Sequence, residues 1–223
     1  MSATALPRLH PLGDAALLCD LPPPATLALQ QQWWALAAQA ARWPGVLELL
    51  PGMNNLTLCF DPQQVELQAL EERVRLAWPT LAPAAGAQAA ARTVEIPTAY
   101  GGEHGPDLEH VARHTGLSPR EVVRRHSGAD YVVYFLGFLP GFAFMGGLPP
   151  ELATPRRGEP RVAVPARSVG IGGEQTGIYP LVSPGGWQLI GRTRLELFDP
   201  KAKEPTLLRP GDRVRFVAES IDA

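Results

Sequence analysis

Residues 134–193 contain the feature that most limits the possible folds of this chain, because glycines and prolines interrupt its short apolar runs throughout. The segment reads YFLGFLPGFAFMGG, then PRRGEPRVAVPARSVGIGGEQTGIYP, then SPGGWQLIGRT. Proline fixes φ and glycine permits positive φ, so each marks a turn or bend that a continuous strand does not need. The pattern predicts short strands joined by tight turns that present side chains to a pocket.

The second half of the chain has the pattern of a β-barrel with helices inserted near its start. Residues 93–99 alternate like a strand, and residues 107–126 show the periodicity of two helices. Ser118 and Glu121 have the spacing of a capping box at the start of the second helix. From 131 to 218 short apolar runs alternate with turns. This order predicts a barrel accompanied by one or two helices.

The first part of the chain alternates strand and helix patterns. A strand is expected at residues 14–21 and a hairpin at 46–60, where a Gly- and Asn-rich loop separates two apolar runs. Thr26 has the position of an N-cap, and the helix after it carries an apolar stripe that we assign to the core: Leu29, Trp33, Leu36 and Ala40. Asp61, followed by proline, predicts the start of a second helix.

An Ala-, Gly- and Pro-rich stretch at 82–91 (APAAGAQAAA) separates these two patterns. Its residues are small and uncharged, as in a linker. We therefore expect two domains, a small N-terminal α+β sandwich at 1–90 and a β-barrel domain at 91–223. The fold class is α+β.

Composition excludes several kinds of partner. The formal net charge is −2, from 20 Lys and Arg against 22 Asp and Glu, and no basic run occurs, so a nucleic-acid partner is not expected. No apolar run approaches the roughly 18 residues that a membrane span needs. Cys19 and Cys59 lie in apolar, strand-like segments and are expected to be buried thiols. Without a secretory signal pattern, the protein is expected to be cytoplasmic.

Familiar catalytic motifs are absent from the sequence. It contains no GxxxxGK[ST] phosphate loop, no GxGxxG turn after a strand and no GxSxG nucleophile elbow. His110 and His114 have the four-residue spacing of metal ligands on a helix, but HExxH and further ligands are missing. We therefore expect no metal site and no self-contained nucleotide site in this chain.

Several words of the central segment, taken together, resemble one protein family over nearly the whole chain. They are GF at 137–138 with PGF at 140–142, PRR at 155–157, PR at 160–161, VP at 164–165, QTG at 175–177 with YP at 179–180, and SPGGW at 183–187 with IGRT at 190–193. This resembles the family of the B subunit of bacterial 5-oxoprolinase, KipI-type kinase inhibitors and allophanate hydrolase subunit 1. Arg167 departs from it, because the family has glycine there. If that turn lines the pocket, an added guanidinium changes the ligand.

The resemblance implies a cyclophilin-like barrel and a heteromeric enzyme that converts 5-oxo-L-proline to L-glutamate. In such an enzyme ATP phosphorylates the lactam oxygen before water opens the ring, and the protein positions the groups and stabilises charge. The resemblance also implies a homologous C subunit that shares the substrate site and an A subunit that completes ring opening. ATP and Mg²⁺ are then expected at the level of the complex, with this chain inactive alone. No catalytic residue is assigned.

Three sets of residues are predicted to bind the substrate. The first set is three arginines, because planar guanidinium groups bind carboxylates and phosphates by two-point contacts. They are Arg157, Arg161 and Arg192, and Arg156, next to Arg157 in the sequence, is not included. Neutral hydrogen bonds to a lactam amide are expected from Gln175 and Tyr179, and an apolar wall from Phe138, Phe142 and Trp187. In the alternative interpretation the aromatic rings are core, and the arginines pin loops to Glu159, Glu174 and Glu196.

Other functions are compatible with the sequence. A KipI-like inhibitor of a sensor histidine kinase has the same sequence words. A component of a urea- or allophanate-type amide-processing enzyme is also compatible with them, and Arg167 makes a changed substrate conceivable. A peptidyl-prolyl isomerase would rest on the implied barrel alone, and a fold does not imply an activity.

Overall fold

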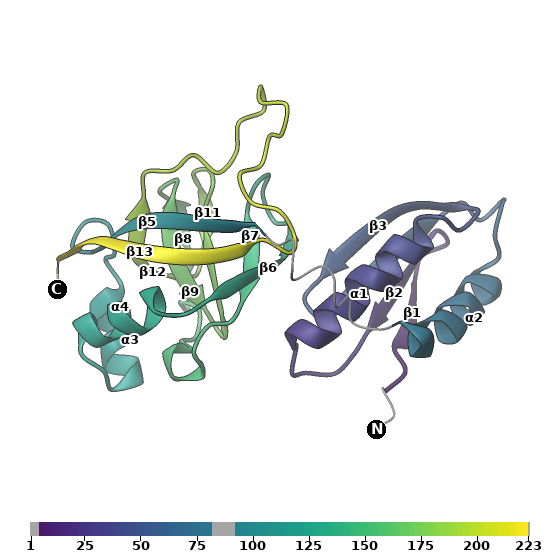
Figure 1. Ribbon diagram of the computed structural model, residues 1–223, viewed down its shortest axis with the longest axis horizontal. Helices are drawn as coiled ribbons and strands as arrows, with labels where there is room; N and C mark the ends of the chain where they lie inside the picture. Colours follow the sequence, from purple (N-terminus) through teal and green to yellow (C-terminus); the bar gives the residue numbers. More distant parts are fainter. Residues whose placement is uncertain (1–4, 82–91, 223) are drawn as a thin grey trace. The chain divides into compact units, whose positions relative to one another are not determined.

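The computed structural model describes residues 5–81 and 92–222, and the chain divides into two compact units, Met1–Ala90 and Ala91–Ala223 (Figure 1). The expected linker at 82–91 lies outside the described residues. Each unit has its own cluster of buried apolar side chains, and the barrel unit has a second, smaller one.

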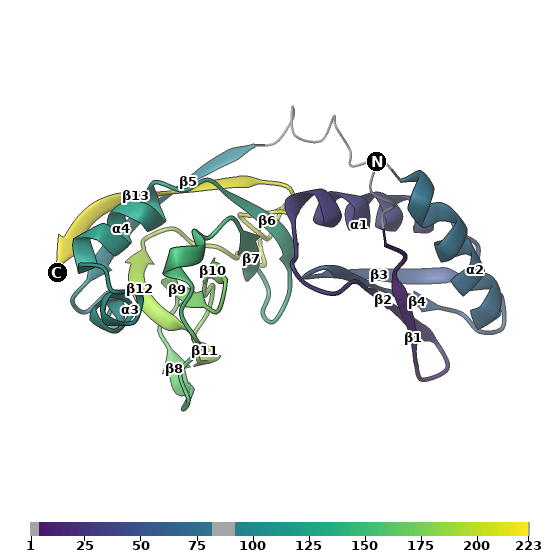
Figure 2. The ribbon, with the colours of Figure 1, turned by 90° about the horizontal axis from the view of Figure 1, so that it is seen from below.

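The first unit is a four-stranded antiparallel sheet with helices packed against it (Figure 2). The strand order is β1-β2-β4-β3, with bounds β1 Arg8–Leu12, β2 Ala16–Asp20, β3 Val46–Gly52 and β4 Asn55–Phe60. The helices are α1 Leu27–Ala40, α2 Leu67–Ala77 and the short 3-10 helix η1 Trp78–Thr80. Trp33 and Trp78 are fully buried between the layers, with ring centroids 4.3 Å apart. The predicted core stripe of α1 is confirmed for Trp33, Leu36 and Ala40, and Leu29 packs against its edge.

Of two local predictions in this unit, one is confirmed. Thr26 is the N-cap of α1, as predicted, and its hydroxyl accepts a hydrogen bond of 3.2 Å from the Leu29 amide. The predicted start of α2 is wrong. Asp61 closes an isolated turn, in which its carboxylate binds the Gln63 amide, and the helix begins only at Leu67. Val65, buried beside the core, separates the turn from the helix.

The second unit is a closed barrel with the strand order β10-β7-β6-β13-β5-β12-β9. The bounds are β5 Thr93–Gly101, β6 Tyr131–Leu136, β7 Ala143–Gly146, β9 Ser168–Gly172, β10 Gln175–Ile178, β12 Gln188–Thr193 and β13 Arg213–Asp222. A separate two-stranded sheet pairs β8 Arg161–Val164 with β11 Ser183–Gly185. The first and last of these strands, β5 and β13, run parallel and are adjacent, so residues far apart in sequence close the barrel. The predicted α+β class with a barrel is confirmed.

Two helices, α3 Leu108–Thr115 and α4 Pro119–Ser127, and a 3-10 helix, η2 Pro150–Leu152, accompany the barrel. In Figure 2 both α-helices lie beside the barrel, where α3 contacts β12 and α4 contacts β13. Ser118 is the N-cap of α4, as predicted, and accepts a hydrogen bond from the Glu121 amide. The carboxylate of Glu121, predicted to complete the capping box, pairs with Arg124 and Arg125. The contact of α3 with β12 places this helix next to the strand that carries Gln188.

One histidine, His126 of α4, is fully buried. The His126 ring lies 2.8 Å from the Tyr100 hydroxyl through Nδ1 and 2.9 Å from the Thr176 hydroxyl through Nε2. Because the Thr176 hydroxyl donates to the Gly170 carbonyl, it accepts from Nε2–H, so Nδ1 accepts from Tyr100. Burial lowers the pKa of His126 to about 3. The ring is therefore neutral and belongs to the core.

Candidate functional site

The loop between β6 and β7 displays one phenylalanine and buries another. Its backbone is tightly turned, with hydrogen bonds from the Leu139 amide to the Gly137 carbonyl (2.7 Å) and from the Phe142 amide to the Leu139 carbonyl (3.0 Å). Phe138 has φ of 67°, in the region that favours glycine, and is 62% exposed. Since residues in this conformation persist only where the surroundings enforce it, and cluster at binding sites, the exposed ring is a candidate ligand contact.

Phe138 stands at the edge of a cavity of about 270 Å³, which we call the aromatic cavity. Prolines 160 and 184 and glycines 185 and 186 complete a wall formed mainly by Phe138, Phe142, Phe144, Arg156, Tyr179 and Trp187. The ring of Phe142 meets those of Tyr179 and Trp187 nearly at right angles, with centroids 5.2 and 5.4 Å apart. Edge-to-face packing of this kind holds the rings in fixed positions. The cavity is thus an apolar cup of defined shape.

Glycines allow the rings to pack this closely. A Cβ atom at Gly185 would lie 2.5 Å from the Tyr179 hydroxyl oxygen, and one at Gly172 would lie 2.5 Å from the Trp187 indole. Neither separation is physically possible without movement of the ring. The Gly-rich words of the sequence therefore serve ring packing as well as turns.

Two polar groups border the aromatic cavity. The Arg156 guanidinium carbon lies 5.9 Å from the Trp187 ring centroid, within the range of a cation–π contact. Burial raises the pKa of the Tyr179 hydroxyl, although a hydrogen bond with the Trp187 backbone and the charges of Arg156 and Arg161 oppose the rise. Tyr179 is therefore a neutral hydroxyl at neutral pH. The cup offers one cation and one neutral hydrogen-bonding group to a ligand.

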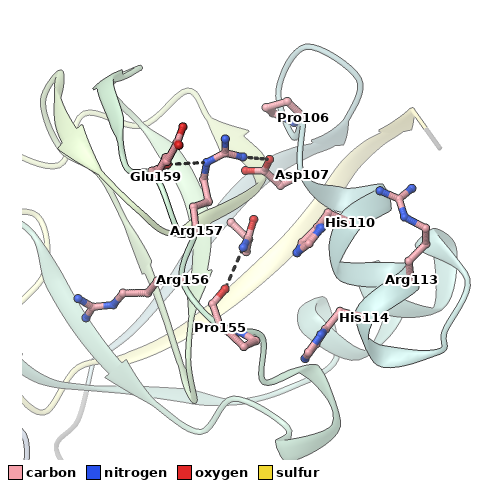
Figure 3. Close-up of a pocket in the computed structure, with 11 residues that line it drawn as sticks. Pro106, Asp107, His110, Arg113, His114, Pro155, Arg156, Arg157 and Glu159 are labelled. Atoms are coloured by element: carbon pink, nitrogen blue, oxygen red, sulfur yellow. Dashed lines mark hydrogen bonds and ion pairs between the residues drawn. The ribbon is translucent and has the colours of Figure 1, made fainter.

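A second, larger cavity of about 620 Å³ lies between α3 and the loop of residues 155–159, and we call it the basic cavity (Figure 3). Its walls include Asp107, His110, Arg113, His114, Arg157 and Gln188. The loop is held from both sides, because the Arg157 amide donates to the Gly186 carbonyl (2.7 Å) and the Gln188 side chain donates to the Pro155 carbonyl (2.8 Å). The wall opposite α3 is therefore a fixed surface.

Asp107 is the buried carboxylate that orders this region. One oxygen accepts hydrogen bonds from Arg161 at 2.8 Å and from Arg157 at 3.3 Å, and the other accepts from the Leu189 amide at 2.7 Å. A buried carboxylate requires such partners, since an unpaired charge away from water is very costly. The alternative interpretation, in which carboxylates hold the arginines and their loops in place, describes Arg157 and Arg161. The carboxylate that holds them is Asp107, however, and none of the three glutamates expected from the sequence.

The adjacent Arg156 and Arg157 diverge. Figure 3 shows Arg157 directed at Asp107, with a further hydrogen bond of 3.3 Å to the Glu159 carbonyl, while Arg156 points away from Asp107 and the histidines. It is Arg156 that reaches Trp187 in the aromatic cavity. Arg156 thus lines both cavities, but its guanidinium is directed at the aromatic one, whereas the guanidinium of Arg157 is directed at the basic one.

The predicted site residues fall into three groups. Four of them line the aromatic cavity: Phe138, Phe142, Tyr179 and Trp187. Arg157 lines the basic cavity. Three line neither of these cavities, namely Arg161, Gln175 and Arg192. Of these three, Arg161 is held by Asp107, and Arg192 donates to the Ala166 carbonyl at 3.0 Å. For the residues of all three groups, the predicted contact with the substrate stays a prediction.

Arg156, Phe144 and Asp107 were not among the predicted substrate contacts. The word PRR contains Arg156, but nothing in it distinguishes which of two adjacent arginines faces an aromatic ring. Asp107 precedes α3, and the arginines that bind it lie 50 and 54 positions later, so no local pattern reveals the pairing.

The departure from the resembled family at Arg167 can also be located. Arg167 is exposed, has φ of 70°, and donates from its guanidinium to the Arg194 carbonyl at 3.4 Å. It lines neither the aromatic nor the basic cavity. The turn that it occupies is the one that Arg192 holds.

Metal sites, membrane-spanning helices and reactive thiols each place requirements on the described part of the chain. Within residues 5–81 and 92–222, no group of three or more His, Cys, Asp or Glu side chains could hold a metal ion. No helix among these residues is long and apolar enough to cross a membrane. Cys19 is buried, as predicted, and burial raises the pKa of its thiol to about 12, whereas Cys59 is only half-buried. A thiol like that of Cys19 stays protonated and is not a nucleophile.

The closed barrel carries an apolar cup and a neighbouring basic cavity, an arrangement that suits a small, partly charged ligand. The chain matches the model of the carboxyltransferase domain, subdomain C and D, over residues 7–208. It belongs to this family.

The similarity to known relatives extends over nearly the whole chain. The B subunit of the 5-oxoprolinase of Escherichia coli O157:H7 is 52% identical over 95% of this chain and 96% of the relative, and that of Haemophilus influenzae is 47% identical over 96% and 99%. The crystal structure of TTHA0988 superposes with a TM-score of 0.77 at 38% identity, covering 92% of this chain but 40% of that one. This chain thus spans less than half of TTHA0988.

Urea amidolyases are more distant relatives. The urea amidolyase of Lachancea kluyveri is 47% identical over 53 residues, which are 22% of this chain and 3% of that protein. The structure of the Kluyveromyces lactis urea amidolyase has a TM-score of 0.76 at 21% identity and covers 99% of this chain and 15% of that one, which shows the shared fold alone.

Proposed function

We propose that this chain is the B subunit of an ATP-dependent 5-oxoprolinase and that its aromatic cavity receives the lactam substrate. The observation that carries the proposal is the similarity over nearly the full length of both chains to curated proteins of that name, at 52% and 47% identity. The aromatic cavity supplies a site whose size and chemistry suit the substrate.

The substrate 5-oxoproline is a small, nearly flat lactam ring with one carboxylate. A cavity of about 270 Å³ lies just below the usual range of ligand sites, roughly 300–1,000 Å³, which suits a small molecule. Trp187 and Phe142 offer apolar faces to the ring carbons. Arg156 at the border offers a planar cation to the carboxylate, and the neutral Tyr179 hydroxyl offers a hydrogen bond to the amide.

The remaining chemistry belongs to the assembled enzyme. We propose a homologous C subunit that completes the substrate site and an A subunit that completes ring opening, in the cytoplasm, where ATP is available. The described residues of this chain offer no cluster for a metal ion, so no step is assigned to Mg²⁺ here. What this chain contributes is the positioning of the lactam and its shielding from water by the aromatic walls.

Reconstitution tests the proposed function. This chain is combined with candidate C and A subunits, each is omitted in turn, and ADP release and glutamate formation from 5-oxoproline are measured. We expect glutamate only when all three are present, with ADP and glutamate formed in equal amounts. A stable three-chain complex without activity would contradict the proposal that 5-oxoproline is the substrate. The absence of any complex would favour a KipI-like kinase inhibitor.

The contacts predicted for Arg161, Gln175 and Arg192 are part of this proposal and require the assembled enzyme. The double variant Arg161→Gln/Arg192→Gln is compared with Arg124→Gln, an exposed arginine of α4. We expect the double variant to lose activity and the control to keep it. If the folded double variant stays fully active, these two arginines do not contact the substrate.

A second function is favoured by the 53-residue likeness to a urea amidolyase. In that case the same complex acts on an acyclic, urea-like amide. Replacing 5-oxoproline by allophanate in the same assay distinguishes the two, since only the better substrate gives fast ADP release at low concentration.

A further inference from the structure

The basic cavity is not used by the proposed function, and its chemistry differs from that of the aromatic cavity. Its volume of about 620 Å³ is within the usual range of small-molecule sites. Its two walls are α3 on one side and the loop of residues 155–159 on the other (Figure 3). Nothing in the apolar cup accounts for the nitrogen-rich side chains gathered here.

The charge of this cavity is positive in effect. Asp107 is satisfied by two guanidinium groups and a backbone amide, so its negative charge is already matched. Glu159 meets Arg157 through its backbone carbonyl, and its own side chain is on the exposed rim. Arg113 adds a further cation to the lining. A cation would be repelled from such a lining, whereas an anion would be attracted.

The nitrogen groups face one another across the cavity. His110 and His114 lie one helical turn apart, and Figure 3 shows both rings on the side of α3 that faces the loop. Arg157 comes from the opposite wall, and its hydrogen bonds to Asp107 and Glu159 are long, at 3.3 Å each. The guanidinium has five N–H donors, so it keeps donors for a ligand.

This arrangement suits a tetrahedral oxyanion better than a carboxylate. A planar carboxylate is satisfied by a single guanidinium fork, which is the contact proposed for Arg156. A phosphate group has oxygens that point in several directions, so it accepts hydrogen bonds from Arg157 and from the imidazoles on the other wall together. Asp107 positions Arg157 for this contact, because it anchors the guanidinium from behind.

We propose that the basic cavity binds the phosphate group of a small phosphorylated molecule through Arg157, His110 and His114. The cavity is larger than an inorganic phosphate ion requires, so the rest of the molecule has room beside it. The inference goes beyond the proposed function, since the site depends on these side chains and not on which amide the enzyme opens.

Calorimetric titration of the full chain tests the proposal. Inorganic phosphate, ADP and malonate are titrated separately at equal ionic strength, and the imidazole proton resonances of the histidines are followed during the same additions. We expect phosphate and ADP to bind and to shift the resonances of His110 and His114, with malonate much weaker. If ADP binds more tightly than phosphate, the ligand of the cavity is a nucleotide. If the two bind equally, the cavity recognises only the phosphate group of its ligand.

Variants with matched controls locate the binding. Arg157→Gln and the double variant His110→Asn/His114→Asn are each expected to weaken phosphate binding about tenfold or more, the loss that follows from one charge-assisted hydrogen bond. Arg124→Gln and His10→Asn change exposed residues outside the cavity and are expected to bind like the unchanged chain. Circular dichroism checks that each variant is folded.

The proposal is overturned if the unchanged chain binds no phosphate, if malonate binds as tightly, or if the cavity variants bind phosphate like their controls. These results are independent of the reconstituted activity. Phosphate binding without 5-oxoproline turnover would support this site and contradict the proposed function. Turnover of 5-oxoproline without phosphate binding would support the proposed function and contradict this site.

Discussion

The two cavities of the barrel unit share one loop, yet they are built in opposite ways. The aromatic cavity is formed by rings that also belong to a buried cluster, including Phe142, Tyr179 and Trp187. The basic cavity is formed largely by exposed side chains on α3 and the loop, and the buried carboxylate of Asp107 anchors the arginines of its wall. In the first, binding surface and core are the same atoms. In the second they are separate.

This difference predicts which changes unfold the protein and which change only its ligands. A ring that is both wall and core contributes to stability, because removing it leaves a void that the surroundings fill incompletely. An exposed histidine at a cavity wall makes few packing contacts, and its replacement is usually tolerated within about 0.5 kcal/mol. Substitutions in the two cavities should therefore differ in what they impair.

The largest expected effect follows from removing the central ring of the aromatic cavity. Trp187 is 4% exposed and packs edge-to-face on Phe142. Trp187→Ala is expected to lower the free energy of unfolding by about 3–5 kcal/mol. Urea denaturation measures this, with His114→Asn as the comparison from the basic cavity, for which a change within about 0.5 kcal/mol is expected. Equal losses of unfolding free energy in the two variants would show that the two cavities do not differ in their contribution to stability.

The buried His126 of α4 gives the next effect, which depends on pH. Burial lowers the pKa of His126 to about 3, against 6.5 for a free histidine, so protonation favours the unfolded chain. The contribution of neutral His126 is complete above pH 6.5 and is lost as the pH falls toward about 3, at up to about 1.4 kcal/mol for each pH unit.

Urea denaturation at several pH values between neutral and about 4 checks this dependence. A His126→Gln variant lacks the titrating ring, so its stability is expected to be lower at neutral pH but to fall less steeply with acid. His110→Asn, which changes an exposed ring in the basic cavity, should keep the slope of the unchanged chain. If His126→Gln shows that same slope, burial of His126 is not what makes the barrel acid-sensitive.

The sequence predicted local features better than long-range ones. Thr26 and Ser118 were found as helix caps because capping depends on residues three positions apart. The aromatic and glycine words predicted a pocket wall because turns and rings lie close together in the sequence. Strand β1 was missed, since it contains Pro11 and lies at a sheet edge, where proline is tolerated.

What the sequence did not reveal depends on contacts between distant segments. The start of α2 was misplaced because Asp61 and Pro62 imitate a helix start, although the chain only makes one turn there. The pairing of Asp107 with two arginines joins segments about 50 residues apart, and it decides which arginine faces which cavity. The direction of a side chain in a loop depends on such long-range contacts and not on the sequence of the loop itself.

The adjacent arginines give an effect of intermediate size that separates the two cavities directly. Arg156→Gln removes the cation beside Trp187 and is expected to raise the KM for 5-oxoproline in the reconstituted enzyme about tenfold, with phosphate binding unchanged. Arg157→Gln is expected to do the reverse. The pair controls for itself, because the two variants make the same substitution at neighbouring positions. If each variant impairs both ligands equally, the cavities are one site.

The smallest effect concerns Arg167, which lies outside both cavities. Its φ of 70° is strained for an L-residue and free of strain for glycine, so Arg167→Gly relieves a cost of about 1 kcal/mol. Glycine also makes the unfolded chain more flexible, which offsets about 0.4–1 kcal/mol of that gain. The expected net change in the free energy of unfolding is therefore within about 1 kcal/mol, measured by urea denaturation.

The same variant tests whether Arg167 reaches a ligand. Because the guanidinium binds only the Arg194 carbonyl among the described residues, neither the KM for 5-oxoproline nor phosphate binding should change in Arg167→Gly. A changed KM with unchanged stability would show that Arg167 reaches the substrate in the assembled enzyme, and the aromatic cavity would then have a second cation.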